Sequence, residues 1–227
     1  MGSERGVDCL ICVATGREGA LLRGFLDGAR PAQGSIAGRR VALVETGVGP
    51  VNAACAATRF LAQRPAAALI VCGVGGAYPG SGLETGDVLC AQEEVYGDLG
   101  ADSETGFVDM QQLGFPVVAA DPPLYNRMPL DLYPCERRGV FVTRSTCTGS
   151  DAAAAALRER TGGDVESMEG AALVHTALLH GLPVGQLRGI SNAVGNRDRG
   201  AWKVTEAARA AQEALLAWLE ASAAATR

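Results

Sequence analysis

The sequence predicts an α/β fold with a largely parallel central sheet. Apolar stretches of strand length alternate with amphipathic stretches of helix length from end to end, which is the pattern of successive strand and helix units. Of the 227 residues, 48 % are hydrophobic and 20 % are charged, a balance that supports a packed core and excludes an intrinsically disordered chain. Because no linker and no internal repeat is visible, we expect one domain over residues 1–227.

The first half of the chain supplies three strands and two helices. In order, these are a strand at Asp8–Ala14, a helix at Arg17–Asp27, a strand at Arg40–Thr46, a helix at Val51–Gln63 and a strand at Ala67–Gly73. Glycines interrupt the apolar run Ala66–Ala77, so the last strand is expected to enter a loop at Gly73. The same run is too short and too broken for a membrane span.

The rest of the chain continues the pattern, with two longer strands at Asp87–Tyr96 and Gly139–Cys147 and a short one at Asp164–Met168. Expected are strands at Asp87–Tyr96, Gly139–Cys147, Asp164–Met168 and Val184–Ser191, and helices at Ser150–Arg160, Glu169–His180 and Thr205–Ala223. Ser150 is a favourable N-cap residue, and Gly181 followed by Pro183 ends the second of these helices. Gly97–Arg138 is the least regular region and is long enough for a lid or an interface insertion.

Charge and cysteine usage exclude several partners. The net charge is −5, the pI is near 5.1 and the arginines are scattered, so no basic face for nucleic acid is expected. Met1–Val7 is too polar for a signal peptide, and most of the seven cysteines lie in apolar segments, which together predict a cytoplasmic protein. Cys9 and Cys12 form a CxxC within a strand and point to opposite faces, so no metal or redox site is expected there.

The glycine clusters do not form a cofactor motif. Gly73–Tyr78 and Gly47–Asn52 both depart from GxGxxG at the last position, and neither GxxxxGK[ST] nor GxSxG occurs. His175 and His180 lie within and at the end of one expected helix, where core packing or a helix-end interaction accounts for each. We therefore expect no cofactor and no metal.

Three polar residues follow strands in apolar or glycine-rich surroundings: Glu18, Glu169 and Asn192. The carboxyl ends of parallel strands meet at one edge of a sheet, so these side chains are expected to share a crevice. Each also has a plainer explanation. The two glutamates suit the first turn of a helix, where the macrodipole favours them, and Asn192 suits an ordinary turn.

Five motifs resemble those of the nucleoside phosphorylase and nucleosidase superfamily. Glu166–Ala172 resembles its MExxA segment, Arg188–Asn192 its RxIS[DN] segment, Thr46–Ala54 its GxGxxxAA turn, Cys72–Gly76 its glycine-rich strand end and Gly86–Val88 its GD[IV]. The motifs stand in the order of the family, and the resemblance covers nearly the whole chain. It implies a three-layer αβα domain with a central mixed, largely parallel sheet, and cleavage of an N-glycosidic bond.

Within that superfamily the chain is most similar to the nucleosidases that cleave futalosine in menaquinone biosynthesis. Glu94–Gly100, Asn192 and Arg197–Arg199 followed by Trp202 carry this likeness. In adenine-directed nucleosidases the position of Asn192 is usually Asp. The resemblance therefore implies that futalosine is cleaved to hypoxanthine and dehypoxanthine futalosine.

The same resemblance favours water over phosphate as the nucleophile. Phosphorylases place arginines at the first turn and ahead of the glycine-rich strand end. Here the first turn carries Glu18 with only Arg17 beside it, and no arginine precedes Gly73. By resemblance, Glu18 would hold and deprotonate the attacking water.

The remaining roles also follow from the resemblance. Glu169 would accept hydrogen bonds from the ribose 2′ and 3′ hydroxyls and stabilise the oxocarbenium-like state. Asn192 would hydrogen-bond a base that tolerates negative charge, such as hypoxanthine, although a flipped amide could also bind adenine. Met168 would pack against the sugar, but it suits a core position equally well. The substrate-binding positions are Gly75, Met168, Ser191, Arg197 and Arg199.

Futalosine carries a benzoate on its 5′ side, which calls for a cation and an apolar wall. The candidates are Arg197 with Arg199 or Arg127 with Arg144 for the carboxylate, and Phe107, Phe115 and Tyr125 for the wall. Relatives often complete this pocket with a neighbouring subunit, so the likeness implies a homo-oligomer, a dimer or higher.

Three other functions stay open at this point. The first is an adenine-directed nucleosidase acting on aminofutalosine or on methylthioadenosine and S-adenosylhomocysteine. The second is a purine nucleoside phosphorylase, and the third is a nucleoside-binding protein without catalysis. The presence of both Glu18 and Glu169 argues against the third.

Overall fold

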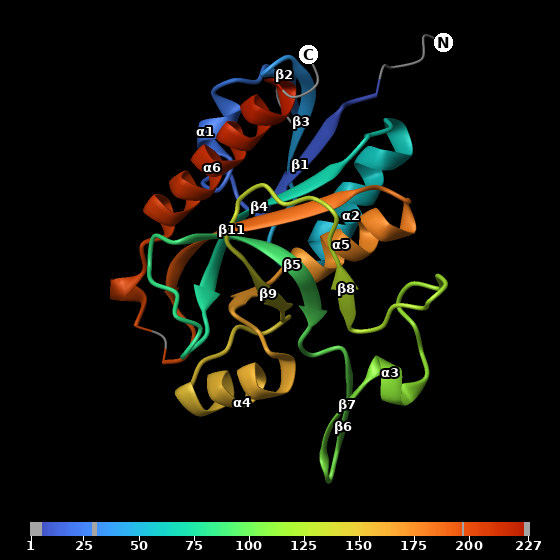
Figure 1. Ribbon diagram of the computed structural model, residues 1–227, viewed down its shortest axis with the longest axis vertical. Coiled ribbons are helices and arrows are strands. Elements are labelled where there is room, and N and C mark those ends of the chain that lie inside the picture. Colours follow the sequence, from blue (N-terminus) through green and yellow to red (C-terminus); the bar gives the residue numbers. More distant parts are fainter. Residues whose placement is uncertain (1–5, 29–30, 197, 225–227) are drawn as a thin grey trace.

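The computed structural model describes residues 6–28, 31–196 and 198–224, and within them nine strands form one sheet (Figure 1). Their order is β10-β9-β5-β11-β4-β1-β3-β2, with β8 beside β5. The strands are β1 (Cys9–Val13), β2 (Ala32–Ile36), β3 (Arg39–Glu45), β4 (Leu69–Ala77), β5 (Val88–Tyr96), β8 (Arg127–Pro129), β9 (Arg138–Thr143), β10 (Val165–Ser167) and β11 (Val184–Ala193). Because β10 also pairs with β4, one half of the sheet closes on itself.

The sheet is mixed, as the resemblance implies. Parallel pairing joins β3, β1, β4 and β11, and also β5, β9 and β10. Antiparallel pairing joins β2 to β3, β8 and β11 to β5, and β10 to β4. The carboxyl ends of β1, β4 and β11 therefore lie at one edge, where a doubly wound sheet binds ligands.

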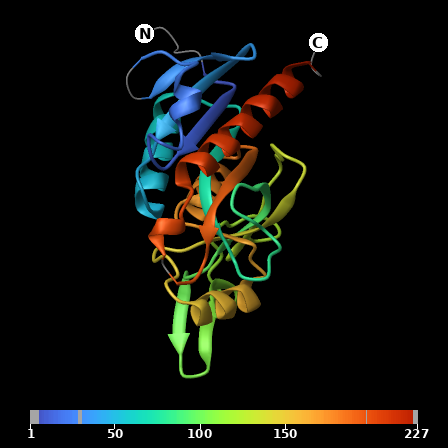
Figure 2. The same cartoon turned by 90° about the vertical axis from the view of Figure 1, so that its left-hand side faces the viewer.

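Helices cover both faces of this sheet (Figures 1 and 2). The helix α1 (Ala20–Arg23) and the long α6 (Val204–Ala224) lie over one face, and α2 (Pro50–Gln63) and α5 (Gly170–Leu179) pack together over the other. The helix α4 (Asp151–Thr161) begins at Ser150, whose side chain accepts a hydrogen bond from the amide of Ala153 as an N-cap does. The predicted cap is therefore confirmed.

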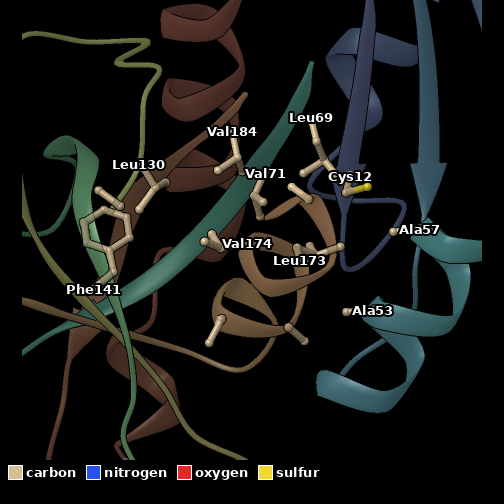
Figure 3. Close-up of a cluster of buried hydrophobic side chains, with 14 of the residues drawn as sticks. Cys12, Ala53, Ala57, Leu69, Val71, Leu130, Phe141, Leu173, Val174 and Val184 are labelled. Carbon is tan, nitrogen blue, oxygen red and sulfur yellow. The ribbon is translucent and has the colours of Figure 1, made fainter. Parts of the chain in front are cut away.

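Two hydrophobic cores follow from the alternation of side chains along β1. Leu10 and Cys12 belong to the core beneath α2 and α5, in which Figure 3 labels Cys12, whereas Cys9 and Ile11 belong to the core beneath α1 and α6. Full burial of a side chain of Leu or Ile size stabilises the folded state by about 1.5–3 kcal/mol. The two cysteines of the CxxC therefore lie in different cores. Burial raises the pKa of the Cys9 thiol to about 12.

In the first half of the chain, one predicted helix is much shorter than expected and one strand was missed. The helix expected at Arg17–Asp27 is only the single turn α1, because Gly19 and Gly24 flank it and disfavour a longer helix. The edge strand β2 was not predicted. Its sequence Ala32–Ile36 has no alternating pattern, and its pairing with β3 determines its conformation.

The strand expected to end at Gly73 continues to Ala77. A Cβ atom at Gly73 would lie 2.6 Å from Arg188 Nη1 and 2.6 Å from Glu18 Oε1. The glycine in β4 therefore gives room to two charged side chains from neighbouring segments. It does not mark the start of a loop.

The irregular region contains its own elements: the hairpin β6 (Gly100–Ser103) and β7 (Gly106–Asp109), the helix α3 (Met110–Leu113) and the strand β8. The hairpin projects away from the main sheet in both views (Figures 1 and 2). Among the described residues, no helix combines the length and apolar character that crossing a membrane requires.

Candidate active site

A cavity of about 300 Å³ opens at the carboxyl ends of β1, β4, β10 and β11. Glu18, Glu169 and Asn192 all line it, so the structure brings the three predicted catalytic residues together. Three predicted substrate-binding residues, Gly75, Met168 and Ser191, line it as well. Within the described residues no cluster of three or more His, Cys, Asp or Glu side chains could hold a metal ion.

Glu18 lies in the turn after β1 and is 4 % exposed. Its Oε2 accepts hydrogen bonds from the amide and the hydroxyl of Thr15, at 2.9 and 2.8 Å, and its Oε1 accepts one from the amide of Val74 at 3.1 Å. It precedes α1 and is not part of the helix's first turn. Three donors, two from the turn after β1 and one from within β4, thus fix a carboxylate at the cavity wall, which a helix-stabilising role would not require.

Glu169 stands at the N-cap position of α5, yet its side chain makes no capping hydrogen bond there. Its Oε1 accepts a hydrogen bond from the amide of Gly49, the residue that precedes α2, at 2.9 Å. Burial raises the pKa of Glu169, and the charge of Arg188 opposes that shift. The carboxylate therefore joins the starts of two helices at the cavity.

Arg188 links the two glutamates and was not predicted. Its Nη1 lies 4.0 Å from Glu18 Oε1 and 4.0 Å from Glu169 Oε2, and its side chain is 1 % exposed. Nη1 also donates to the carbonyl of Val74 at 3.2 Å. The signal was present in the sequence, since an arginine inside the apolar strand Val184–Ser191 must find partners when it is buried.

Asn192 follows a bulge in β11 between Ile190 and Asn192. Its Oδ1 accepts a hydrogen bond from Ser191 Oγ at 2.7 Å, and its Nδ2 donates to the carbonyl of Ala193 at 2.8 Å. The hydroxyl of Ser191 also lies 3.2 Å from the carbonyl of Gly75. The bulge re-aims the strand end and places the amide at the cavity.

Met168 lies on the cavity wall and outside the hydrophobic cores of the described residues. Its Sδ is 3.3 Å from Cys147 Sγ. The alternative of a core methionine is therefore wrong. Arg197 lies outside the described residues, and only the backbone of Arg199 is described, in the turn η1 (Arg199–Ala201).

The structure does not bring most of the proposed tail-binding residues to this cavity. Phe107, Tyr125 and Arg127 line a second cavity of about 360 Å³, and Phe115 is 64 % exposed. Arg127 forms an ion pair with Glu93 there.

Arg144 lies nearer to the site cavity than Arg127 does. Its Nη1 donates to Thr148 Oγ1 at 2.9 Å, and Thr148 lines the site cavity. Trp202 is the aromatic residue among the described residues that line the site cavity.

A buried polar network supports the start of α5. Glu94 is fully buried, and burial raises its pKa to about 7. Its carboxylate accepts hydrogen bonds from Thr143 Oγ1 and Gln186 Nε2, both at 2.7 Å. Thr143 Oγ1 in turn accepts one from the amide of Ala171 at 2.8 Å. This chain ties β5, β9 and β11 to the turn of α5 that carries Glu169.

The fold and the cavity are those of an enzyme superfamily that cleaves nucleosides. The sequence profile of the phosphorylase superfamily matches residues 23–224, so the chain belongs to that superfamily. A methylthioadenosine/S-adenosylhomocysteine nucleosidase from S. pneumoniae, solved with a transition-state inhibitor, superposes with a TM-score of 0.79 at 26 % identity, covering 94 % of this chain and 99 % of that one. An S-adenosylhomocysteine nucleosidase from Streptococcus pyogenes has the same fold, with a TM-score of 0.79 at 21 % identity, covering 97 % of this chain and 99 % of that one.

Sequence relatives narrow the family further. A futalosine hydrolase from Streptomyces coelicolor is 38 % identical over 76 % of this chain and 76 % of its own length. Those from Thermus thermophilus and Acidothermus cellulolyticus are each 37 % identical, over 76 % and 92 % of this chain and 78 % and 88 % of their own lengths. Within the superfamily, this places the chain in the futalosine hydrolase family.

Proposed function

We propose that the chain is a hydrolytic nucleosidase that cleaves the N-glycosidic bond of futalosine and releases hypoxanthine and dehypoxanthine futalosine. The observation that carries the proposal is the pair of buried carboxylates, Glu18 and Glu169, held on either side of Arg188 in a cavity of nucleoside size. The identity to curated futalosine hydrolases supports the substrate.

Glu18 is the proposed general base. Water forms a bond to C1′ and loses a proton to the Glu18 carboxylate, while the electrons of the C1′–N9 bond leave with the base. The base then takes up a proton and departs as neutral hypoxanthine. The hydrogen bonds from Thr15 and Val74 hold the carboxylate in place before the substrate binds, which lowers the cost of orienting it during the reaction.

Glu169 and Arg188 set the electrostatics around the ribose. The carboxylate of Glu169 can accept hydrogen bonds from the 2′ and 3′ hydroxyls, and its negative charge stabilises the positive charge that develops on the sugar. Arg188 lies 4.0 Å from both carboxylates and keeps two like charges compatible in one buried site. Asn192 hydrogen-bonds the departing base.

The charge of the cavity wall favours water as the nucleophile. Among the described residues that line the cavity there is no Lys or Arg, whereas Glu18, Glu166 and Glu169 are all present. A phosphate ion entering this space would face three carboxylates and, among the described lining residues, no cation. This supports hydrolysis over phosphorolysis.

The benzoate tail, the assembly and the compartment belong to the same proposal. We place the tail near Trp202, which lines the cavity, and we keep Arg197 and Arg199 as the proposed partners of its carboxylate, from their positions in the sequence beside Trp202. The enzyme acts in the cytoplasm as a homo-oligomer, in line with its buried cysteine thiols and the precedent of its superfamily.

Product analysis tests the proposal. The purified chain is incubated with futalosine, its 6-amino analogue, methylthioadenosine and inosine, each with and without phosphate. We expect phosphate-independent release of hypoxanthine from futalosine and little from inosine, which lacks the tail. A strict need for phosphate, with a sugar 1-phosphate product, would establish a phosphorylase, and faster release of adenine would establish the adenine-directed alternative.

A further inference from the structure

Glu166 is a third carboxylate of the cavity, and the catalytic steps above do not use it. It lies on β10, is 8 % exposed and lines the cavity with Thr148 and Asn192. A buried carboxylate at a ligand-binding wall costs free energy unless its charge has partners. Hydrogen-bond donors must therefore stabilise the Glu166 carboxylate, and its place at the cavity wall allows it to bind a ligand.

The hydrogen bonds of Glu166 come from Tyr78 and Thr148. Its Oε2 accepts from Tyr78 Oη at 2.8 Å and from Thr148 Oγ1 at 2.5 Å, and its Oε1 accepts from the amide of Thr148 at 2.8 Å. An ionised carboxylate offers about four acceptor directions over its two oxygens. Oε2 uses two and Oε1 uses one, so Oε1 retains one acceptor direction for a ligand.

The register of the sheet places Glu166 and Asn192 on either side of Gly76. Glu166 on β10 pairs with Gly76 on β4, and Asn192 on β11 pairs with the same Gly76. Directly paired residues of neighbouring strands point to the same face of a sheet. A Cβ atom at Gly76 would lie 2.8 Å from Val194 Cγ2 and 3.1 Å from Asn192 Nδ2, so only glycine leaves this face flat between the two side chains.

The distance to the reaction centre suits a purine. The amide of Val74 binds Glu18, and Gly76 lies two residues further along β4, about 6.6 Å at the rise of a strand. In the proposed binding mode, a base whose sugar is held at Glu18 and Glu169 would extend over Gly76 toward Glu166 and Asn192, which line the same cavity.

We infer that Glu166 is a specificity-determining residue that accepts a hydrogen bond from N1–H of a 6-oxopurine, while the Asn192 amide serves the O6 and N7 edge. This inference rests on the proposed function of the cavity. Hypoxanthine carries a proton on N1, whereas adenine has an unprotonated acceptor at that atom. Adenine would therefore place a lone pair against a buried carboxylate, which is the kind of mismatch that gives strong discrimination.

The test compares base binding in two variants of the same clamp. Glu166→Gln keeps the size of the side chain but removes its charge and one acceptor. Tyr78→Phe removes one donor to Glu166 and leaves the carboxylate in place. Binding of hypoxanthine and of adenine is measured by titration calorimetry on the wild-type chain and on each variant, together with the melting temperature.

We expect Glu166→Gln to weaken hypoxanthine binding about tenfold or more, since charged hydrogen bonds are roughly twice as strong as neutral ones, and to leave adenine binding equal or tighter. Tyr78→Phe should lower the melting temperature but keep the ratio of the two affinities. An unchanged ratio in Glu166→Gln, or the same change of ratio in Tyr78→Phe, would show that Glu166 acts only as a structural clamp.

Failure of this inference and failure of the proposed function give different experimental results. If the chain hydrolyses futalosine and Glu166→Gln leaves its preference for hypoxanthine over adenine unchanged, only this inference is overturned. Hypoxanthine binding that depends on Glu166 in a chain that does not cleave futalosine would overturn the proposed function alone. A wild-type chain that binds adenine as tightly as hypoxanthine would also overturn the inference.

Discussion

The two ends of the cavity stabilise their ligands by different means. At the reaction end, Glu18 and Glu169 lie on either side of Arg188, and backbone amides from Val74 and Gly49 hold the carboxylates. At the base end, Glu166 and the amide of Asn192 flank the bare backbone of Gly76, with Val194 beside them. The first end combines opposite charges, and the second offers directional donors and acceptors.

This difference indicates that bond cleavage and choice of base are separable in this protein. In the proposed function, charge at the reaction end acts on the ribose ring, which every candidate nucleoside shares. Hydrogen-bond direction at the proposed base end acts on N1, O6 and N7, which are the atoms that distinguish hypoxanthine from adenine. Substitutions at the two ends should therefore have different signatures.

Glu18→Gln should have the largest effect. Loss of the general base is expected to lower kcat by about 10²- to 10⁴-fold for every substrate, while product binding changes little because the shape of the side chain is kept. Steady-state rates and hypoxanthine titration measure the two quantities. Full activity in this variant would reject the assignment of the base.

Glu169→Gln should lower kcat by roughly 100-fold or more, as removal of a single electrostatic contact at a transition state does. Because burial raises the pKa of Glu169, wild-type activity should fall as the pH drops through that pKa and the carboxylate takes up a proton. The acidic limb of the kcat profile should therefore move to lower pH in the variant. An acidic limb at the same pH would assign it to another group.

Asn192→Asp should have a smaller effect that differs between substrates. A protonated Asp can donate to N7, so the ratio of kcat/KM for the 6-amino analogue over futalosine should rise by about tenfold. Ser191→Ala is the matched control, since it removes the hydrogen bond that Ser191 Oγ donates to Asn192 but leaves the amide itself. A ratio that moves equally in both variants would show that loosening of the strand end, and not the amide, is responsible.

Glu94→Gln should affect stability more than chemistry. The pKa of Glu94 is about 7 in the folded chain and near 4.5 when unfolded, so between these values the folded state binds more protons. The stability contributed by the protonated form is present below the unfolded pKa and is lost as the pH rises through the folded pKa. Urea unfolding from about pH 5 to pH 8 should show a decline in the wild type that is weaker in Glu94→Gln.

Strand and helix periodicity predicted most of the sheet and the helices α2, α4, α5 and α6. It failed where tertiary contacts decide the conformation. At β4, the glycines resemble a loop, but they allow Arg188 and Glu18 to approach the strand. At β2, an edge strand with no apolar alternation depends on its partner β3.

In the candidate site, too, some residues could be predicted from the sequence and others depend on tertiary contacts. Glu18 and Asn192 could be found because they lie at the carboxyl ends of β1 and β11, which are both parallel to β4. Glu169 follows β10, whose antiparallel pairing with β4 was not predicted. Arg188 and Glu166 stand inside strands, where period alone cannot distinguish a buried functional charge from a solvent-facing one. Only the pairing of β10 and β11 with β4 brings Glu166 and Asn192 to Gly76.

The most direct test of separable ends is the ratio of kcat/KM for futalosine over its 6-amino analogue, measured in Glu169→Gln and in Asn192→Asp against the wild type. We predict that Glu169→Gln lowers kcat/KM for both substrates alike and keeps the ratio, whereas Asn192→Asp shifts the ratio toward the 6-amino analogue. A tenfold change of the ratio in Glu169→Gln, or an unchanged ratio in Asn192→Asp, would contradict this prediction.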